Sequence, residues 1–231
     1  NAGTITVTTT QRGIFGTHSS QQTYNVPTNN GQPMPGATKA DYDRADRYLH
    51  ALADKTGGRL YEANDTNQLA ASFSRIAEEL LRAGFRYVQL DEPSYTGYVD
   101  PATLARMRAA GDDPLANLSR AVDADNAVIA GLEGATFGLH VCRGNRASMW
   151  HREGSYDAIA ERLFGGLRFD RLLLEYDTAR AGGFEPLRFV PKGVTVALGL
   201  ITTKKGEVED PANLVRRIND AARFIPLEQL A

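Results

Sequence analysis

Residues 136–145 read Thr-Phe-Gly-Leu-His-Val-Cys-Arg-Gly-Asn, an apolar run that ends with a histidine and a cysteine two positions apart. Cys142 is the only cysteine in the 231 residues of the sequence. In an extended strand, side chains at positions i and i+2 point to the same face, so His140 and Cys142 are directed to one place. Imidazole nitrogen and thiolate sulfur are ligands that zinc prefers. The stretch therefore predicts a strand that carries half of a zinc site.

One more apolar strand precedes this one along the sequence and two follow it, and helical segments separate the four strands. Apolar strands that alternate with helices are typical of parallel βα units. A closed βα barrel needs eight strands and about 250 residues. The four strands after residue 84 therefore predict an α/β fold that contains part of a TIM-type βα barrel. The predicted strands cover about 85–90, 136–142, 171–176 and 194–201, and the predicted helices about 101–110, 115–132, 156–164 and 211–224.

The first eighty residues differ from the rest, because their first half is rich in Thr, Gln, Asn, Gly and Pro. This composition predicts a short strand followed by a long polar loop, and then a small α/β fragment. The second helix of this fragment is amphipathic, and Leu69, Phe73, Ile76 and Leu80 are predicted to form its buried face. We therefore predict a domain boundary after residue 82. The predicted elements are a strand at 4–8, a loop through 36, a helix at 41–56, a strand at 59–61 and a helix at 69–81.

The overall composition excludes several classes of partner. Lys and Arg number 26 and Asp and Glu number 28, which gives no electrostatic case for binding nucleic acid or an anionic membrane. No apolar run approaches the roughly 20 residues of a membrane span. A single cysteine excludes an internal disulfide and fits a reducing compartment, so we expect a cytoplasmic protein. The chain starts at Asn1 and not at Met, which indicates a fragment.

Polar side chains stand at the end of each predicted strand. In a βα barrel the working residues lie at the carboxyl ends of the strands. His140, Cys142 and Glu175 are therefore three candidate zinc ligands on neighbouring strand ends. Asp91, at the end of the first strand, is placed to hold a cationic group of a substrate, such as an α-amino group. Lys204 follows the last strand.

Each of these residues also has an ordinary structural explanation. A lone cysteine in an apolar strand is usually an inert core residue, and a lone histidine at a strand end is usually a hydrogen-bonding group. Glu175 could pair with Arg143 or Arg180, and Asp91-Glu92-Pro93 could form a helix-capping turn. The joint pattern favours a site over four separate coincidences.

The sequence from about residue 83 to 231 resembles the C-terminal catalytic region of cobalamin-independent methionine synthases, and in particular their bacterial methionine synthase II-like relatives. This resemblance implies a βα barrel, a zinc cofactor and methyl transfer to a thiol. In that family homocysteine becomes methionine, and the partners are this small-molecule thiol and a methyl donor such as methyltetrahydrofolate. The phrases that carry the resemblance are at 86–93, 139–146, 172–177, 198–204 and 217–230.

The resemblance also implies roles for individual residues. His140, Cys142 and Glu175 match three zinc ligands of the family, and Asp91 matches the carboxylate that holds the amino group of homocysteine. The fourth ligand is a cysteine just beyond the last matching phrase, and this sequence stops before it. We therefore expect an impaired enzyme that binds zinc weakly or not at all.

Two further positions depart from the family pattern. The histidine that donates a proton in true synthases aligns near Lys204, and a glutamate that contacts folate aligns with Gly97. The part of the barrel that carries the rest of the folate site is not in the sequence. These departures leave open alkyl transfer to a different thiol by the same zinc chemistry, an alternative that Lys204 favours.

Residues 48–61 and 76–80 resemble the C-terminal end of a von Willebrand factor A-like domain. The metal-binding Asp-x-Ser-x-Ser loop of such domains lies earlier in their fold and is missing from this sequence. A join near residues 79–84 would make the gene a fusion of two truncated pieces. A non-catalytic von Willebrand A-like binding module is therefore the remaining alternative.

Overall fold

The computed structural model describes residues 2–13, 16–27, 38–61, 63, 66–145 and 147–231. The chain divides into two compact units, Asn1–Tyr61 and Glu62–Ala231. The predicted boundary was after residue 82, whereas the structure places the helix before that residue in the second unit. The assignment of residues 1–82 to a von Willebrand A-like fragment stays a prediction.

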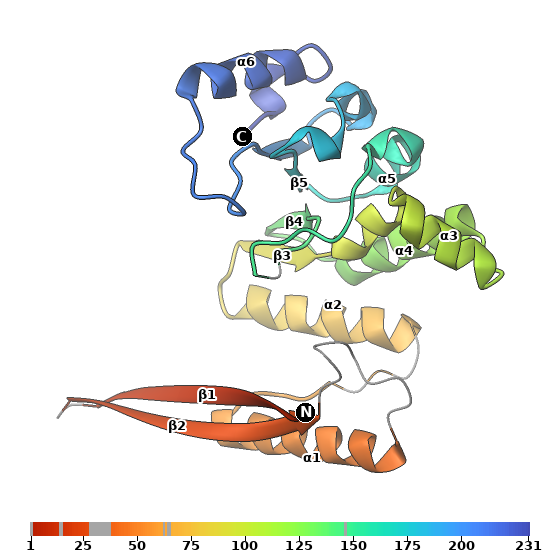
Figure 1. The fold of residues 1–231 in the computed structure, drawn as a ribbon. Coiled ribbons are helices and arrows are strands. Elements are labelled where there is room, and N and C mark those ends of the chain that lie inside the picture. The colour runs from red at the N-terminus through yellow and green to blue at the C-terminus, as the bar shows by residue number, and fades with distance from the viewer. Residues whose placement is uncertain (1, 14–15, 28–37, 62, 64–65, 146) are drawn as a thin grey trace. The chain divides into compact units, whose positions relative to one another are not determined.

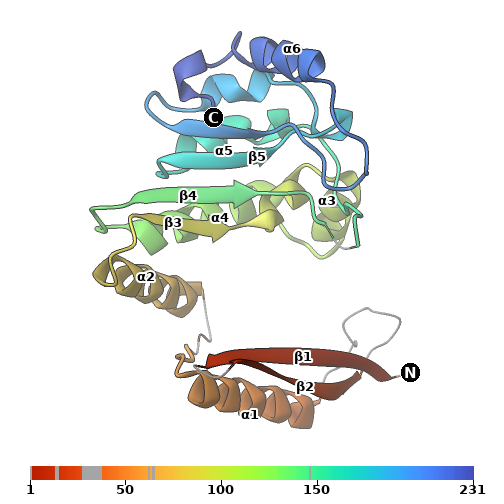
Figure 2. The same cartoon turned by 90° about the vertical axis from the view of Figure 1, so that its left-hand side faces the viewer.

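The second unit is built on four parallel strands, which lie side by side in the order of the sequence. Figure 2 shows the strands running in one direction. Four parallel strands alternating with helices confirm the α/β prediction, and they are half the number that closes a βα barrel. The strands are β3 (Tyr87–Asp91), β4 (Thr136–Val141), β5 (Arg171–Glu175) and β6 (Thr195–Gly199).

Helices follow and connect these strands (Figure 1). Three of them begin with an Asp-Pro pair, in which the Asp side chain accepts hydrogen bonds from the first-turn amides and the Pro has the backbone angle of a helix already. The caps are Asp100, Asp113 and Asp210. The α-helices are α2 (Thr66–Arg82), α3 (Pro101–Ala109), α4 (Pro114–Ile129), α5 (Ala160–Gly166) and α6 (Pro211–Ala221). The 3-10 helices are η1 (Pro93–Tyr98), η2 (Tyr156–Ala158), η3 (Ala179–Ala181), η4 (Glu185–Phe189) and η5 (Leu227–Gln229).

The core of the second unit lies between the helices and one face of the sheet. Leu139, Val141, Leu172, Leu174 and Val196 are almost completely buried, and they belong to one cluster with side chains of α4 and α5. Side chains at the alternate positions of the strands point to the other face, where they are only partly covered. That second face carries the candidate site.

The predicted buried face of α2 is confirmed in part, since Leu80 packs against the core and Ile76 is half-buried. Ser72 and Ala77 are the buried residues of this helix, whereas Leu69 and Phe73 are 48% and 45% exposed. Leu69 and Phe73 line an open cleft of about 420 Å³ between α2, α4 and β3. The prediction is therefore wrong for Leu69 and Phe73.

The first unit contains a hairpin and a helix. Strand β1 (Ala2–Gly13) pairs antiparallel with β2 (Gly16–Pro27), so the predicted strand at 4–8 is confirmed and the predicted loop is wrong as far as residue 27. The rest of that loop, 28–36, lies outside the described residues. Helix α1 (Lys39–Thr56) has a capping box at Thr38 and ends at Gly57, as predicted.

Two further findings concern the described residues. The strand predicted at Arg59–Leu60–Tyr61 is wrong, because these residues have no regular secondary structure. Among the helices that the structure describes, none is long and apolar enough to cross a membrane.

Candidate functional site

The predicted site residues lie at the carboxyl ends of the parallel strands. Asp91 ends β3 and pairs in register with His140 of β4, and Glu175 ends β5 and pairs in register with Gly199 of β6. Cys142 follows β4 directly, two positions after the histidine. The parallel register therefore brings these ends to one edge of the sheet.

Asp91 and His140 contact each other across the two strands. The Nδ1 atom of His140 lies 3.2 Å from Oδ1 of Asp91, and the side-chain amide of Gln89 donates to the same oxygen through Nε2 at 2.9 Å. The Asp91 side chain is 68% exposed and that of His140 is 35% exposed. A carboxylate on Nδ1 orients the imidazole and leaves Nε2 as the nitrogen for another partner. The contact with Asp91 thus confirms the prediction that His140 is a hydrogen-bonding residue, and His140 Nε2 stays available to another partner.

Cys142 carries a free thiol that is partly buried. Its backbone carbonyl accepts a hydrogen bond of 3.1 Å from the hydroxyl of Thr96, a completely buried residue of η1. Glu92 begins η1 and accepts a hydrogen bond from the amide of Ser94. The Asp91-Glu92-Pro93 turn therefore caps η1. It was predicted to cap the helix that begins at Pro101, and Asp100 caps that helix instead.

Glu175 lies beside the peptide that follows Cys142. Its Oε2 atom accepts a hydrogen bond of 2.9 Å from the backbone amide of Arg143. Its Oε1 atom lies 3.1 Å from Nη2 of Arg180 and 3.0 Å from Nζ of Lys204. The alternative explanation of Glu175 as an ion-pair partner of Arg180 is thus confirmed, and Lys204 is a second cation on the same oxygen.

Asp177 completes what we call the four-charge cluster, which consists of Glu175, Asp177, Arg180 and Lys204. Arg180 donates to both carboxylate oxygens of Asp177 at 2.7 and 2.6 Å, and Lys204 Nζ lies 3.5 Å from Oδ2. Burial alone would raise the pKa of Asp177, but the hydrogen bond with Thr202 and the two cations outweigh it and hold the pKa below its ordinary value.

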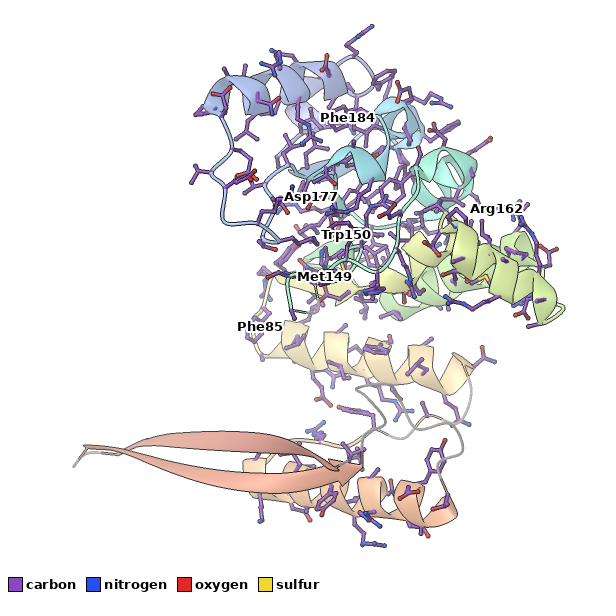
Figure 3. The ribbon with its side chains drawn as sticks, viewed as in Figure 1. Phe85, Met149, Trp150, Arg162, Asp177 and Phe184 are labelled. Carbon is purple, nitrogen blue, oxygen red and sulfur yellow. The ribbon has the colours of Figure 1, made fainter. Side chains whose placement is uncertain are left out.

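The Trp150 ring and a small cavity lie next to the four-charge cluster. The guanidinium of Arg180 lies 4.3 Å from the centre of the Trp150 ring, and Figure 3 labels both Trp150 and Asp177. A cavity of about 290 Å³ opens beside the cluster on the free face of the sheet. Its polar lining includes His140, Glu175, Asp177, Thr203 and Lys204, and its apolar lining includes Leu173, Ala197, Leu198 and Ile201.

Arg143 is completely buried, and its guanidinium packs over the Tyr156 ring at 4.8 Å. Within the described part of the chain, Nε, Nη1 and Nη2 of Arg143 have no hydrogen-bond partner. Burial, partly offset by this cation, raises the pKa of Tyr156 to about 12. Arg143 was predicted as an ion-pair partner of Glu175, and this prediction is wrong for its guanidinium. The backbone amide of Arg143 contacts Glu175 instead.

The donor set fits zinc in its chemistry. An imidazole nitrogen, a thiol sulfur and a carboxylate oxygen are ordinary zinc ligands, and His140, Cys142 and Glu175 supply them from neighbouring strand ends. The described residues nevertheless contain no ready group of three or more His, Cys, Asp and Glu side chains around one point. Lys204 and Arg180 both form ion pairs with Oε1 of Glu175, so a metal ion would have to compete with these two cations for that oxygen.

The sequence predicted Arg180 only as a structural partner of Glu175 and assigned no role to Asp177 at the same strand end. Thr96 was not predicted as a neighbour of the site. Asp177 and Arg180 follow Glu175 by two and five positions, so their charges were a usable local signal. Thr96 gave no such signal, because its contact with Cys142 spans 46 positions.

Comparisons with known proteins support the same fold. No family model matches the sequence. The chain is 38% identical over 198 residues to the uncharacterized protein YxjH of Bacillus subtilis (strain 168), a match that covers 84% of this chain and 48% of that protein. It is also 38% identical over 167 residues to the uncharacterized protein YxjG of the same organism, covering 71% of this chain and 44% of that protein. The chain spans about half the length of the curated relatives it matches.

Among solved structures, a B12-independent methionine synthase from Shewanella sp. W3-18-1, determined in complex with selenomethionine, matches with a TM-score of 0.51 and 20% sequence identity. The match covers 71% of this chain and 45% of that chain. At this identity the likeness concerns the fold. The four parallel strands and their helices therefore form an α/β unit of the kind found in that synthase, and they correspond to a partial βα barrel.

Proposed function

We propose that the second unit belongs to a zinc-dependent methyltransferase that transfers a methyl group to a thiol. The observation that carries this proposal is the placement of His140, Cys142 and Glu175 at the ends of two adjacent parallel strands, in a fold similar to that of a methionine synthase. The acceptor that the resemblance implies is homocysteine.

The residues of this chain would share the work in the following way. Zinc, when bound, lowers the pKa of a thiol while its sulfur stays nucleophilic. His140, Cys142 and Glu175 would hold the ion, and the Asp91 carboxylate on His140 Nδ1 would keep Nε2 directed toward it. The Asp91 side chain is largely exposed and could bind the ammonium group of a substrate. The thiol of that substrate would then lie near the cavity that His140 and Glu175 line.

The substrate sulfur would then attack an electrophilic methyl carbon, and the leaving group would depart with the bonding electron pair. The folate-contacting glutamate aligns with Gly97, so a folate donor has no matched carboxylate here. We therefore expect the chain to show thiol activation more readily than transfer from methyltetrahydrofolate.

The experiment uses a small methyl electrophile, such as methyl iodide, which needs no folate site. The 231-residue chain with added zinc should accelerate S-methylation of homocysteine over zinc in buffer, whereas the Cys142→Ser chain should not. Mass spectrometry of the thioether products measures the rate. Equal rates for the two chains would contradict the proposal.

A second acceptor class is favoured by Lys204, which lines the cavity where the family has a histidine. The same assay with a panel of thiols separates the candidates. Preference for homocysteine supports the first acceptor, and preference for a thiol without an α-amino group supports the alternative.

A further inference from the structure

The four-charge cluster is neutral and almost closed to solvent. The exposed fractions of its side chains are 12% for Glu175, 2% for Asp177, 9% for Arg180 and 6% for Lys204. Two carboxylates face two cations, so each buried charge has a partner of opposite sign. Glu175 therefore carries no uncompensated negative charge that would attract a further cation.

The two cations of the cluster are held differently. Arg180 contacts both oxygens of Asp177 at 2.7 Å or less and is covered by the Trp150 ring. Lys204 lies in a segment without regular secondary structure after β6, and its backbone amide donates a local hydrogen bond of 3.2 Å to the Thr202 hydroxyl. Lys204 is thus the cation that can leave Glu175 more easily.

A second partner for Lys204 is already within reach. Its Nζ atom lies 3.0 Å from Glu175 but also 3.5 Å from Oδ2 of Asp177. A short shift of the flexible lysine side chain would keep it paired with Asp177 and free Oε1 of Glu175 on that side. The displacement therefore needs no change in the strands.

We propose that Lys204 is a built-in competitor for the Glu175 carboxylate and lowers the affinity of this chain for a divalent metal ion. The inference rests on the proposed function, because it concerns the metal ligand Glu175. A divalent ion at Glu175 meets the ammonium of Lys204 at close range, and like charges a few ångströms apart repel strongly in a site shielded from water. Metal binding must therefore move Lys204 away from Glu175.

The test compares Lys204→Met with Lys205→Met, a matched change at the exposed neighbouring lysine. Zinc affinity of each full chain is measured by competition with a chromophoric chelator. Removing the competing ammonium should tighten zinc binding at least about tenfold, the effect of one ordinary charge–charge coupling. The Lys205→Met chain should bind zinc as the unchanged chain does. Equal or weaker binding by Lys204→Met would overturn the proposal.

A measurement on the unchanged chain covers the case in which Lys204→Met fails to fold. In chain labelled with ¹⁵N-lysine, saturating zinc should shift the Nζ resonance of Lys204 and leave that of Lys205 in place. A Lys204 resonance that zinc does not move would also overturn the proposal.

Adding Cys142→Ser to each chain separates this inference from the proposed function. If zinc binds equally to the lysine variants and binding is lost with Cys142→Ser, the competitor role is wrong and the proposed metal site stands. If none of the chains binds zinc, both the competitor role and the zinc part of the proposed function fail.

Discussion

The backbone amide of Arg143 donates a 2.9 Å hydrogen bond to Oε2 of Glu175. This bond joins the end of β4 to the end of β5 and places the Glu175 carboxylate beside the peptide after Cys142. Parallel strands bring their carboxyl ends together in any case, and this bond fixes the orientation of the carboxylate within that arrangement. The site is thus defined by backbone geometry as well as by side chains.

The hydroxyl of Thr96 should stabilise the backbone at Cys142. Thr96→Val keeps the volume of the buried side chain but removes a hydroxyl that is shared between the carbonyls of Pro93 and Cys142, so the free energy of unfolding should fall by about 1–2 kcal/mol. The matched control is Thr178→Val, because the Thr178 hydroxyl is buried and has no hydrogen-bond partner among the described residues. That variant should be as stable as the unchanged chain or slightly more so. Urea unfolding curves decide, and equal losses for the two variants would refute the role of Thr96.

The buried guanidinium of Arg143 should cost stability. Arg143→Met keeps the backbone bond to Glu175, fills a similar volume and removes a buried charge without a hydrogen-bond acceptor among the described residues. The free energy of unfolding should therefore rise, by about 1–3 kcal/mol. The exposed change Arg108→Met is the control and should alter it by less than about 0.5 kcal/mol. A loss of stability in Arg143→Met would mean that the guanidinium has a partner in solution.

Asp125 should give the chain a pH-dependent stability. Burial raises the pKa of Asp125 to about 6, with a further contribution from Glu92 and an opposing one from the hydrogen bond of the Tyr95 hydroxyl. The folded pKa is higher than the unfolded value of about 3.9. The folded chain therefore binds the Asp125 proton more tightly, and this contribution to stability is present below pH 4 and is lost as the pH rises to about 6.

The measurement is the free energy of unfolding as a function of pH. Asp125→Asn should remove a fall of about 1–2 kcal/mol between pH 4 and pH 6, after allowance for the partial exposure of this side chain. Asp123→Asn, at an exposed position of the same helix, should leave the fall unchanged. Parallel pH profiles for unchanged chain and Asp125→Asn would show that Asp125 titrates normally.

The strand ends could be predicted from sequence because their signal is local. Each of Asp91, His140 and Glu175 stands within or directly after an apolar run, and parallel strands bring such positions to one edge. The Asp-Pro pairs that begin α3, α4 and α6 are equally local. The general layout of the second unit follows from such short-range patterns.

The contact of Glu175 with Arg180 was predicted because the two residues are near in sequence, but its contact with Lys204 was not. Lys204 is 29 positions away, and its contact depends on the path of the chain after β6. The hairpin of β1 and β2 was missed for another reason, since its polar Thr- and Gln-rich sequence lacks the apolar alternation that marks a strand. The face of α2 was predicted correctly at Leu80, which packs on the core, and wrongly at Leu69 and Phe73, which line an open cleft.

The most direct measurement is a cobalt titration of the 231-residue chain, followed by absorption spectroscopy. Cobalt(II) takes the place of zinc at nitrogen and sulfur sites, and a thiolate ligand gives a charge-transfer band in the near ultraviolet. Because Lys204 and Arg180 hold Glu175, we expect weak binding, so that the band develops only with excess cobalt. It should weaken in His140→Gln and vanish in Cys142→Ser. A chain that shows no band at saturating cobalt, or a band that persists unchanged in Cys142→Ser, would contradict a metal site at these strand ends.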